Sequence, residues 1–175
     1  MKRFAILILV ALGLAACGGQ YDFKLTSTAF TEGNAIPTRH ACDGENLSPA
    51  LNWTDPPAGT QSFALIMDDP DAPMGTWDHW LLFNLDPELR GLPEAAGNDP
   101  DSEDFQGIAG NNSWSVLRYG GPCPPGGVHR YFFKFYALDT LLDLEAGVDK
   151  ATLMEAMSGH IVAETVLMGT YEIIE

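Results

Sequence analysis

Short apolar runs separated by Gly- and Pro-rich segments constrain the fold of this chain most. Arg130–Leu138 (RYFFKFYAL) is rich in aromatic residues that recur with a period of two, and Phe23–Thr28 alternates in the same way. Ser62–Met67 and His79–Leu85 are nearly continuous apolar runs, and Glu164–Ile174 has the composition of a final strand. Runs of this length and period are typical of β-strands. We therefore expect a mainly β chain folded as a sandwich.

Only one segment carries the signals of an α-helix. Asp149 is a suitable N-cap, Leu153, Met154 and Met157 form an apolar stripe, and Gly159 can end the helix. The chain that follows the expected leader is about 160 residues long, which is enough for one domain with a hydrophobic core. The sequence therefore predicts a single domain with little helix.

The N-terminus has the pattern of an export signal. Lys2 and Arg3 precede an apolar run, and the sequence LAAC ends at Cys17. LAAC resembles the bacterial lipoprotein box, which implies cleavage after residue 16 and lipidation of Cys17, with stable anchoring by several acyl chains. Gly18 stands where an aspartate would retain a lipoprotein in the inner membrane, so we expect the outer membrane, facing the periplasm. The alternative is an ordinary secretory signal that leaves Cys17 as a free thiol.

These observations divide the chain into three parts. We expect a signal peptide over 1–16, a lipidated tether over 17–22 and one folded domain over 23–175. The net charge is −15, and loss of two basic residues with the signal makes it more negative. Because Lys and Arg neutralise phosphates, this charge argues against nucleic acid as a partner and against adhesion to anionic headgroups. The lipid anchor, not surface charge, would hold the protein at the membrane.

Two further cysteines remain after Cys17 is set aside. Cys42 and Cys123 both lie in loops rich in Gly and Pro, and an even number of cysteines in an exported protein suits a disulfide. Two buried free thiols would have the same sequence pattern, so both alternatives stay open at this point.

An acidic, proline-stiffened segment, DDPDAP, follows one apolar run directly. It contains Asp69, Asp71 and Pro73, and its simplest interpretation is a solvated turn, because Asp and Pro are turn formers. More than forty residues rich in Gly, Pro, Asn and Asp lie between Leu85 and Arg130. Segments of this length inside a domain are usually functional or disordered, and we expect the second half of this one to face DDPDAP as an ordered wall.

The ends of the expected strands bring several polar residues to one rim. Asp69 and Asp71 follow one strand, His79 opens the next, and His129 and Tyr131 open a third. A carboxylate beside an imidazole favours the charged imidazolium, and backbone amides around Gly120–Gly121 can add an anion-binding concavity. The sequence therefore predicts a pocket for a phosphate group.

Six motifs in this order resemble those of the phosphatidylethanolamine-binding protein family, whose members are also called Raf-kinase-inhibitor-like proteins: CDGENLSPALNW, DPDAP, WDH, GGPCPP, HRY and GHIVAETVLMGTY. The resemblance covers nearly all of the chain after the leader. It implies a β-sandwich with one large antiparallel sheet, a smaller sheet and one or two short helices.

The resemblance also implies which residues bind the ligand. The family's pocket carries over onto Asp69, Asp71, His79, Gly121, His129 and Tyr131, with Pro73 and Pro122 shaping the walls. Two features depart from the family pattern: Asp78 precedes the histidine, and the loop Ala95–Phe105 is unusually acidic. That acidity argues against strong binding of anionic phospholipid.

Three classes of function follow. The first is a binding module for a small phosphate-bearing ligand or a phospholipid headgroup, with no catalytic residue, cofactor or metal, because no activated nucleophile is evident. The second is an inhibitor or regulator of a kinase or serine protease that acts through protein contact. The third is a metal-dependent hydrolase that uses Asp69, Asp71, His79 and His129, which are acceptable ligand types but lack the spacing of a dedicated zinc site.

Overall fold

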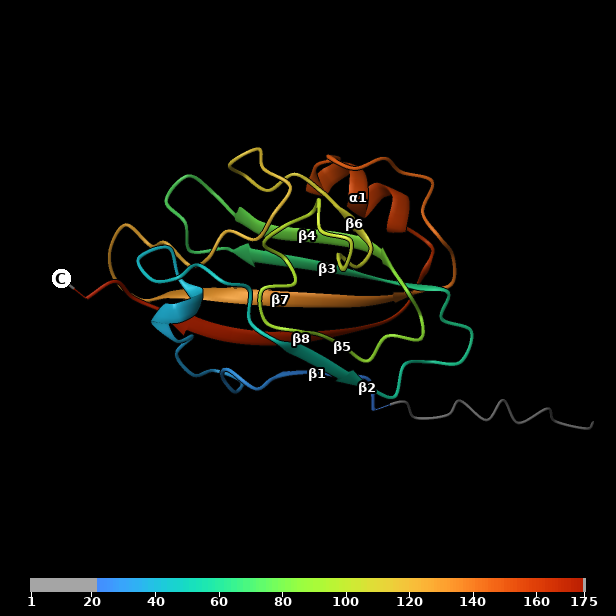
Figure 1. Cartoon of the computed structure of the whole chain (residues 1–175), viewed down its shortest axis with the longest axis horizontal. Helices are drawn as coiled ribbons and strands as arrows, with labels where there is room; N and C mark the ends of the chain where they lie inside the picture. The colour runs from blue at the N-terminus through green and yellow to red at the C-terminus, as the bar shows by residue number, and fades with distance from the viewer. Residues whose placement is uncertain (1–21, 175) are drawn as a thin grey trace, which may run out of the picture.

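The structure, a computed structural model, describes residues 22–174 (Figure 1). The expected signal peptide (1–16) and Cys17 lie outside the described residues, and the expected tether overlaps them only at Asp22. Within 22–174, no helix combines the length and the apolar character needed to cross a membrane.

Two antiparallel sheets pack against each other, as the sequence predicts (Figure 1). The larger sheet has the strand order β6-β4-β3-β7-β8, and the smaller has the order β1-β2-β5. The large sheet consists of β3 (Ser62–Asp69), β4 (Trp77–Leu85), β6 (Ile108–Ala109), β7 (His129–Leu138) and β8 (Ile161–Tyr171). The small sheet consists of β1 (Lys24–Ser27), β2 (Leu51–Thr54) and β5 (Gly91–Leu92).

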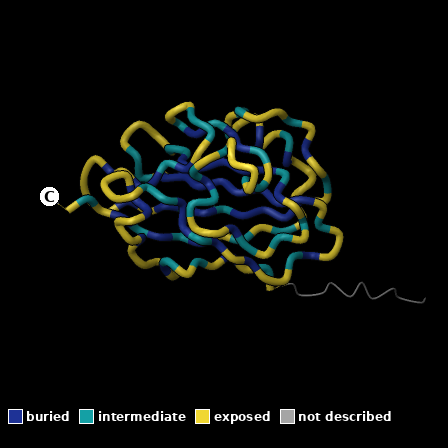
Figure 2. Tube along the Cα trace, viewed as in Figure 1, coloured by how far each residue is buried: buried dark blue, intermediate teal, exposed yellow. Residues whose placement is uncertain are grey.

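Aromatic side chains fill the space between the two sheets. The rings of Phe63 on β3 and Phe135 on β7 stack with centroids 5.1 Å apart, and Trp53 on β2 lies 4.4 Å from Phe135. Aromatic pairs of this kind add about 0.5–1.5 kcal/mol each beyond the burial of their area. The buried strands at the centre and the exposed loops around them are evident in Figure 2. The period-two aromatic pattern of β7 therefore reflects the burial of alternate side chains between the two sheets, as expected for a strand of a sandwich.

The helix α1 (Lys150–Met157) packs on part of the other face of the large sheet (Figure 1). Asp149 caps the helix as predicted, because its Oδ1 accepts a hydrogen bond from the backbone N–H of Thr152 at 2.9 Å. Leu153 and Met157 are buried in a second apolar cluster with residues of the sheet. Met154 was wrongly assigned to the apolar stripe, since it is 38% exposed on the outer side of the helix.

The strand β3 continues two residues beyond the predicted apolar run. Asp68 and Asp69 belong to the strand and are buried, so DDPDAP is not a solvated turn throughout. Asp68 tolerates full burial because its Oδ2 accepts hydrogen bonds from the ammonium groups of Lys134 at 2.7 Å and Lys150 at 2.6 Å. Long-range ion pairs of this kind leave no signal in the local sequence pattern.

The strands β2, β5 and β6 were not predicted. β5 and β6 have two residues each, which is too few to show an alternation, whereas the short alternation of β2 was missed. A single-turn 3-10 helix, η1 (Thr38–His40), leads into the loop that carries Cys42. Cys42 and Cys123 form a disulfide, with their Cα atoms 5.4 Å apart, so the structure contains the pairing that the sequence left open. The backbone N–H of Cys42 also donates to the carbonyl of Pro122 at 3.0 Å. The two loops are thereby fastened together beside the ends of β4 and β7.

Candidate functional site

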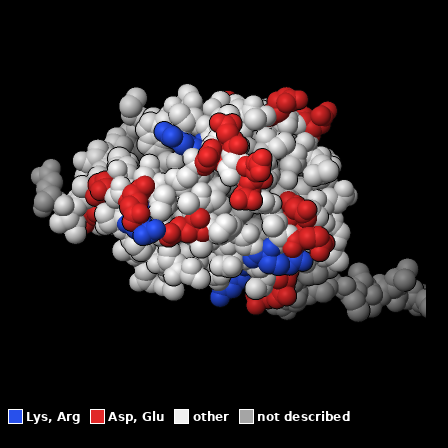
Figure 3. All heavy atoms as spheres, in the orientation of Figure 1, with Lys and Arg blue, Asp and Glu red and all other residues white. Residues whose placement is uncertain are grey.

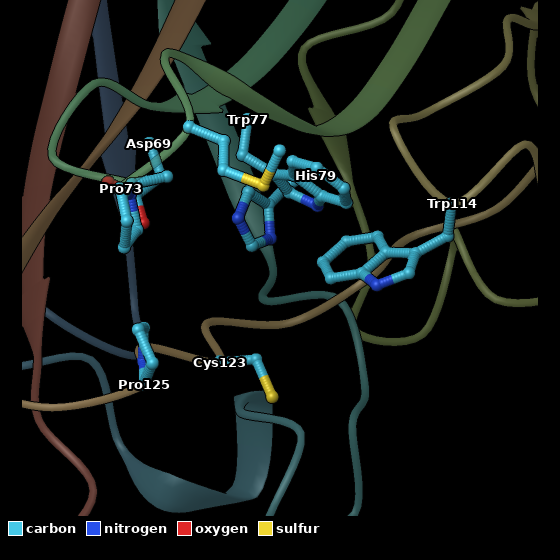
Figure 4. A pocket seen from close by; sticks show the side chains of 9 residues that line it. Asp69, Pro73, Trp77, His79, Trp114, Cys123 and Pro125 are labelled. Carbon is cyan, nitrogen blue, oxygen red and sulfur yellow. The ribbon is translucent and has the colours of Figure 1, made fainter.

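A cavity of about 350 Å³ opens where β3 ends and β4 begins (Figure 4). We call it the primary cavity. Its walls come from the DDPDAP turn, from the start of β4 and from the long segment before β7, and they consist of Asp69, Ala72, Pro73, Met74, Trp77, His79, Trp114, Cys123 and Pro125. The imidazole of His79 lies between Asp69 and Trp114, with Cys123 and Pro125 on the opposite wall.

Asp69 is the acidic group of the primary cavity and is held by two hydrogen bonds. Its Oδ1 accepts from the backbone N–H of Asp71 at 2.8 Å, and its Oδ2 lies 2.8 Å from Nδ1 of His129. Asp69 is 3% exposed and His129 is 7% exposed, so this contact is largely shielded from water. His129 therefore lies behind Asp69 and orients its carboxylate, whose remaining lone pairs can accept from a ligand.

His79 is the imidazole of the primary cavity, and its protonation differs from our expectation. Its Nδ1 lies 2.7 Å from the carbonyl oxygen of Gly120, an arrangement that places a proton on Nδ1 and leaves Nε2 for other partners. Burial lowers the pKa of His79, an effect that outweighs the opposing influence of the Gly120 carbonyl and of Asp69. The prediction that the neighbouring carboxylates keep this histidine charged in the free protein was therefore wrong, because desolvation disfavours the cation.

Tyr131 packs against His79 from β7. The two rings form an edge-to-face pair with centroids 5.2 Å apart. The Tyr131 hydroxyl is buried and has no hydrogen-bond partner among the described residues. Burial, and to a lesser degree the charge of Asp69, raise the pKa of Tyr131, so the hydroxyl stays protonated at neutral pH. The hydroxyl lies near the carboxylate of Asp69, and Tyr131 is fully buried behind the lining of the primary cavity.

Asp71 does not orient a histidine as the sequence suggested. Its carboxylate accepts two hydrogen bonds from the guanidinium of Arg130, at 2.7 and 2.9 Å, and one from the backbone N–H of that residue. These bonds lower the pKa of Asp71 to about 2. The pair joins the DDPDAP turn to the start of β7. Asp71 thus supports the shape of the site without lining the primary cavity, whereas Pro73 lines it as expected.

The glycine pair before the disulfide has a structural role in place of the expected anion-binding one. The backbone N–H of Gly120 donates to the carbonyl of His79 at 3.0 Å, and that of Gly121 donates to Oδ1 of Asn46 at 2.7 Å. Both amides are thus occupied. A Cβ at Gly121 would lie 2.3 Å from the carbonyl oxygen of His40, so only glycine fits there. Gly121 and Pro122 therefore hold the loop in place and do not line the primary cavity.

The wall predicted from the long segment faces DDPDAP, since Trp114 and Cys123 line the primary cavity with Asp69. Met74 and Pro125 also line it, and they were not singled out by the sequence analysis. Met74 is 92% exposed at the rim, and an exposed methionine beside a turn has no distinguishing sequence signal.

The arrangement of the charged and metal-ligating side chains bears on which ligands the described residues can bind. Within 22–174, no group of three or more His, Cys, Asp or Glu side chains is arranged to hold a metal ion. The two histidines not assigned to the predicted site have separate partners: His40 is buried against the carbonyl of Leu47, and His160 is exposed beside Asp139. Acidic side chains dominate the molecular face drawn in Figure 3. The acidic side chains of the loop Ala95–Phe105 are exposed: Asp99, Asp101, Glu103 and Asp104.

Sequence comparisons identify relatives along nearly the whole described chain. A family model described as phosphatidylethanolamine-binding protein matches residues 26–172. A UPF0098 protein from Methanothermobacter thermautotrophicus is 50% identical over 151 residues, which cover 85% of this chain and 97% of that relative. A UPF0098 protein from Chlamydia muridarum is 44% identical over 154 residues and covers 85% of this chain and 98% of that relative.

Two solved structures share the architecture. A homologue of phosphatidylethanolamine-binding protein from Chlamydia trachomatis matches with a TM-score of 0.80 and 41% identity, over 87% of this chain and 98% of that chain. YbcL from E. coli, described as a member of the mammalian PEBP family, matches with a TM-score of 0.81 and 32% identity, over 87% of this chain and 99% of that chain. The two-sheet fold is therefore common to this chain and to those proteins.

Proposed function

The chain belongs to the phosphatidylethanolamine-binding protein family, and we propose that it is a binding module that takes the phosphate group of a small ligand into the primary cavity. One observation carries this proposal: the acceptor Asp69 and the imidazole of His79 line the same cavity, and the buried hydroxyl of Tyr131 lies next to Asp69. The volume of about 350 Å³ suits a headgroup or a small organic phosphate.

The balance of donors and acceptors favours a phosphate monoester over a diester. A monoester monoanion has a P–OH group that can donate to the carboxylate of Asp69, while its other oxygens accept from Tyr131 and from Nε2 of His79. The imidazole of His79 must take up a proton on binding, because its Nδ1 already donates to the carbonyl of Gly120. A diester has no such proton, so its oxygens would face the carboxylate without a hydrogen bond between them. A buried charge without a partner costs several kcal/mol, which is the basis for discrimination.

The test compares two ligands that differ in this one feature. Phosphoethanolamine is a monoester, and glycerophosphoethanolamine presents the same amine on a diester, as a phospholipid headgroup does. We expect calorimetric titration to give weak binding of phosphoethanolamine, in the millimolar to high micromolar range, because one small group makes few contacts. Glycerophosphoethanolamine should bind at least about tenfold more weakly.

Two results would contradict the proposal. If neither phosphoethanolamine nor inorganic phosphate binds, the proposed phosphate site is excluded. Tighter binding of the diester would indicate that the cavity prefers a phospholipid headgroup to a phosphate monoester. A Tyr131→Phe variant supplies the control, since it retains the ring against His79 and removes only the hydroxyl. It should lose about 0.5–1.5 kcal/mol of binding free energy if the hydroxyl donates to the ligand.

We further propose that the binding domain is held at the cell envelope by a lipid on Cys17, at the outer membrane and facing the periplasm. The LAAC sequence supports this location. The disulfide between Cys42 and Cys123 supports an oxidising compartment, because such bonds persist outside the cytoplasm. In this proposal the protein binds its ligand without transforming it and requires neither cofactor nor metal.

A further inference from the structure

A second cavity, of about 320 Å³, lies beside the primary cavity and shares Trp114 and Cys123 with it. We call it the Arg118 cavity, since Arg118 is the charged residue of its lining. It is bounded on the side of the long segment by Val116 and Tyr119. The two wall residues in common place the two cavities next to each other.

The indole of Trp114 separates the two cavities and is fixed from both sides. It makes edge-to-face contacts with His79 and Trp77, with ring centroids 5.0 and 5.4 Å apart. On the other side it packs so closely on Gly120 that a Cβ there would lie 2.6 Å from the ring. The indole is also 44% exposed at the surface, so a ligand that spans the cavities can lie along it.

Two side chains of the Arg118 cavity, Asn46 and the exposed Arg118, have donors without an acceptor among residues 22–174, whereas Asn112 and Tyr119 donate to backbone carbonyls. The Oδ1 of Asn46 accepts from the backbone N–H of Gly121 at 2.7 Å, and this bond leaves Nδ2 with no hydrogen bond among residues 22–174. In that same stretch the guanidinium of Arg118 makes neither an ion pair nor a hydrogen bond. By contrast, Arg39 and Arg130 pair with carboxylates.

The lining of the Arg118 cavity contains no Asp or Glu. This local composition contrasts with the net charge of −15 for the whole chain. A strongly acidic protein repels anions over most of its surface, so a cavity that contains an unpaired cation is a point of selective attraction. An arginine guanidinium and an amide N–H₂ both suit a carboxylate or a phosphate.

We propose that the Arg118 cavity binds a second anionic group of the ligand whose phosphate occupies the primary cavity. This proposal rests on the function proposed above and narrows the ligand class to organic phosphates that carry a carboxylate or a second phosphate. Arg118 supplies the charge, Asn46 supplies a neutral donor, and Trp114 sets the separation between the two anionic groups.

The test uses two probes that differ in the second anionic group. Glycerol 3-phosphate has one phosphate, and 3-phosphoglycerate has a carboxylate in place of the terminal alcohol. In calorimetric titrations of the wild-type protein, 3-phosphoglycerate should bind about tenfold more tightly than glycerol 3-phosphate. Arg118→Gln should remove that preference. Lys24→Gln, which also removes a positive charge but lies on β1 and lines neither cavity, should retain it.

Each result decides the proposal. Equal affinity of the two probes for the wild-type protein would overturn the second subsite while leaving the phosphate site intact. A preference that persists in Arg118→Gln would overturn the role of Arg118. Binding of neither probe would overturn the phosphate site and this inference together, so the two failures are distinguishable. Comparison of the unfolding midpoints of the three proteins verifies that the variants are folded.

Discussion

The Nδ1 of His129 lies 2.8 Å from Oδ2 of Asp69, and both side chains are almost completely buried. The two residues are 60 positions apart in the chain, one at the end of β3 and the other at the start of β7. Because the other oxygen of Asp69 accepts from the backbone of its own turn, the carboxylate has one fixed orientation toward the primary cavity. In the proposed site, this contact would fix the position of the carboxylate that accepts from the ligand.

Substitution of Asp69 by Asn tests that orientation. An asparagine can still accept the hydrogen bond from the backbone N–H of Asp71, but it has no charge and only one acceptor oxygen. Binding of phosphoethanolamine should weaken by about 1–3 kcal/mol, as measured by calorimetry. Asp99→Asn in the exposed acidic loop is the matched control, and an equal loss in both variants would contradict a specific role for Asp69.

The lowered pKa of His79 predicts how stability and binding depend on pH. The folded protein binds fewer protons at this site than the unfolded chain does between the lowered pKa and the ordinary histidine value of 6.5. The free energy of unfolding should therefore rise with pH across that window and should fall on acidification. Urea unfolding at several pH values measures this slope, which should be smaller in His79→Gln, and an equal slope in the variant would contradict this origin.

Anion binding should reverse the protonation preference of His79. A bound phosphate favours the imidazolium, so binding takes up a proton whenever the pH lies above the lowered pKa of His79 in the free protein. Affinity should decrease as pH rises through neutrality. Calorimetry in buffers of different ionisation enthalpy measures the uptake directly, and an uptake that persists unchanged in His79→Gln would assign it to another group.

The contact between Asp71 and Arg130 predicts a stability difference that disappears in acid. Bonds from Arg130 lower the pKa of Asp71 from 3.8 to about 2, so their contribution is fully present above pH 3.8 and is lost as pH falls toward 2. Because the pair is partly exposed, Asp71→Asn should cost only about 0.2–1 kcal/mol near neutrality. Urea unfolding of both proteins should converge at low pH, and a constant difference would contradict this origin.

The disulfide should stabilise both the fold and the site. Cys42 and Cys123 are 81 residues apart, and a bond that closes a loop of that length contributes about 2–4 kcal/mol by restricting the unfolded chain. The double variant Cys42→Ser/Cys123→Ser should therefore unfold at lower urea concentration. Cys123 also lines the primary cavity, so phosphoethanolamine should bind more weakly to the folded variant. Equal stability with and without reductant would contradict the prediction.

The lipid anchor is tested at Cys17. Because LAAC fits the lipoprotein box, Cys17→Ser should release the protein from the membrane fraction of the producing bacterium. Fractionation followed by immunoblotting measures the change. Wild-type partitioning by the variant would exclude lipidation as the means of attachment.

The sequence alone was sufficient for the main strands, the helix and the family. The alternation in RYFFKFYAL and the Asp149 cap are local features, and local chain geometry determines the structure that they adopt. The resemblance of six ordered motifs brought Asp69, His79, His129 and Tyr131 into one predicted site, and the structure places them together.

Only the tertiary structure decided the protonation of His79 and the hydrogen-bond partner of Asp71. The pKa of His79 is lowered because neighbouring elements bury its side chain. Asp71 pairs with Arg130 and not with His129, the residue before it. Burial and ion pairing depend on residues brought together from distant parts of the chain, so neither has a local period or spacing. For the same reason, the sequence did not reveal that Arg118 lines a second cavity, which lies next to the primary cavity and shares Trp114 with it.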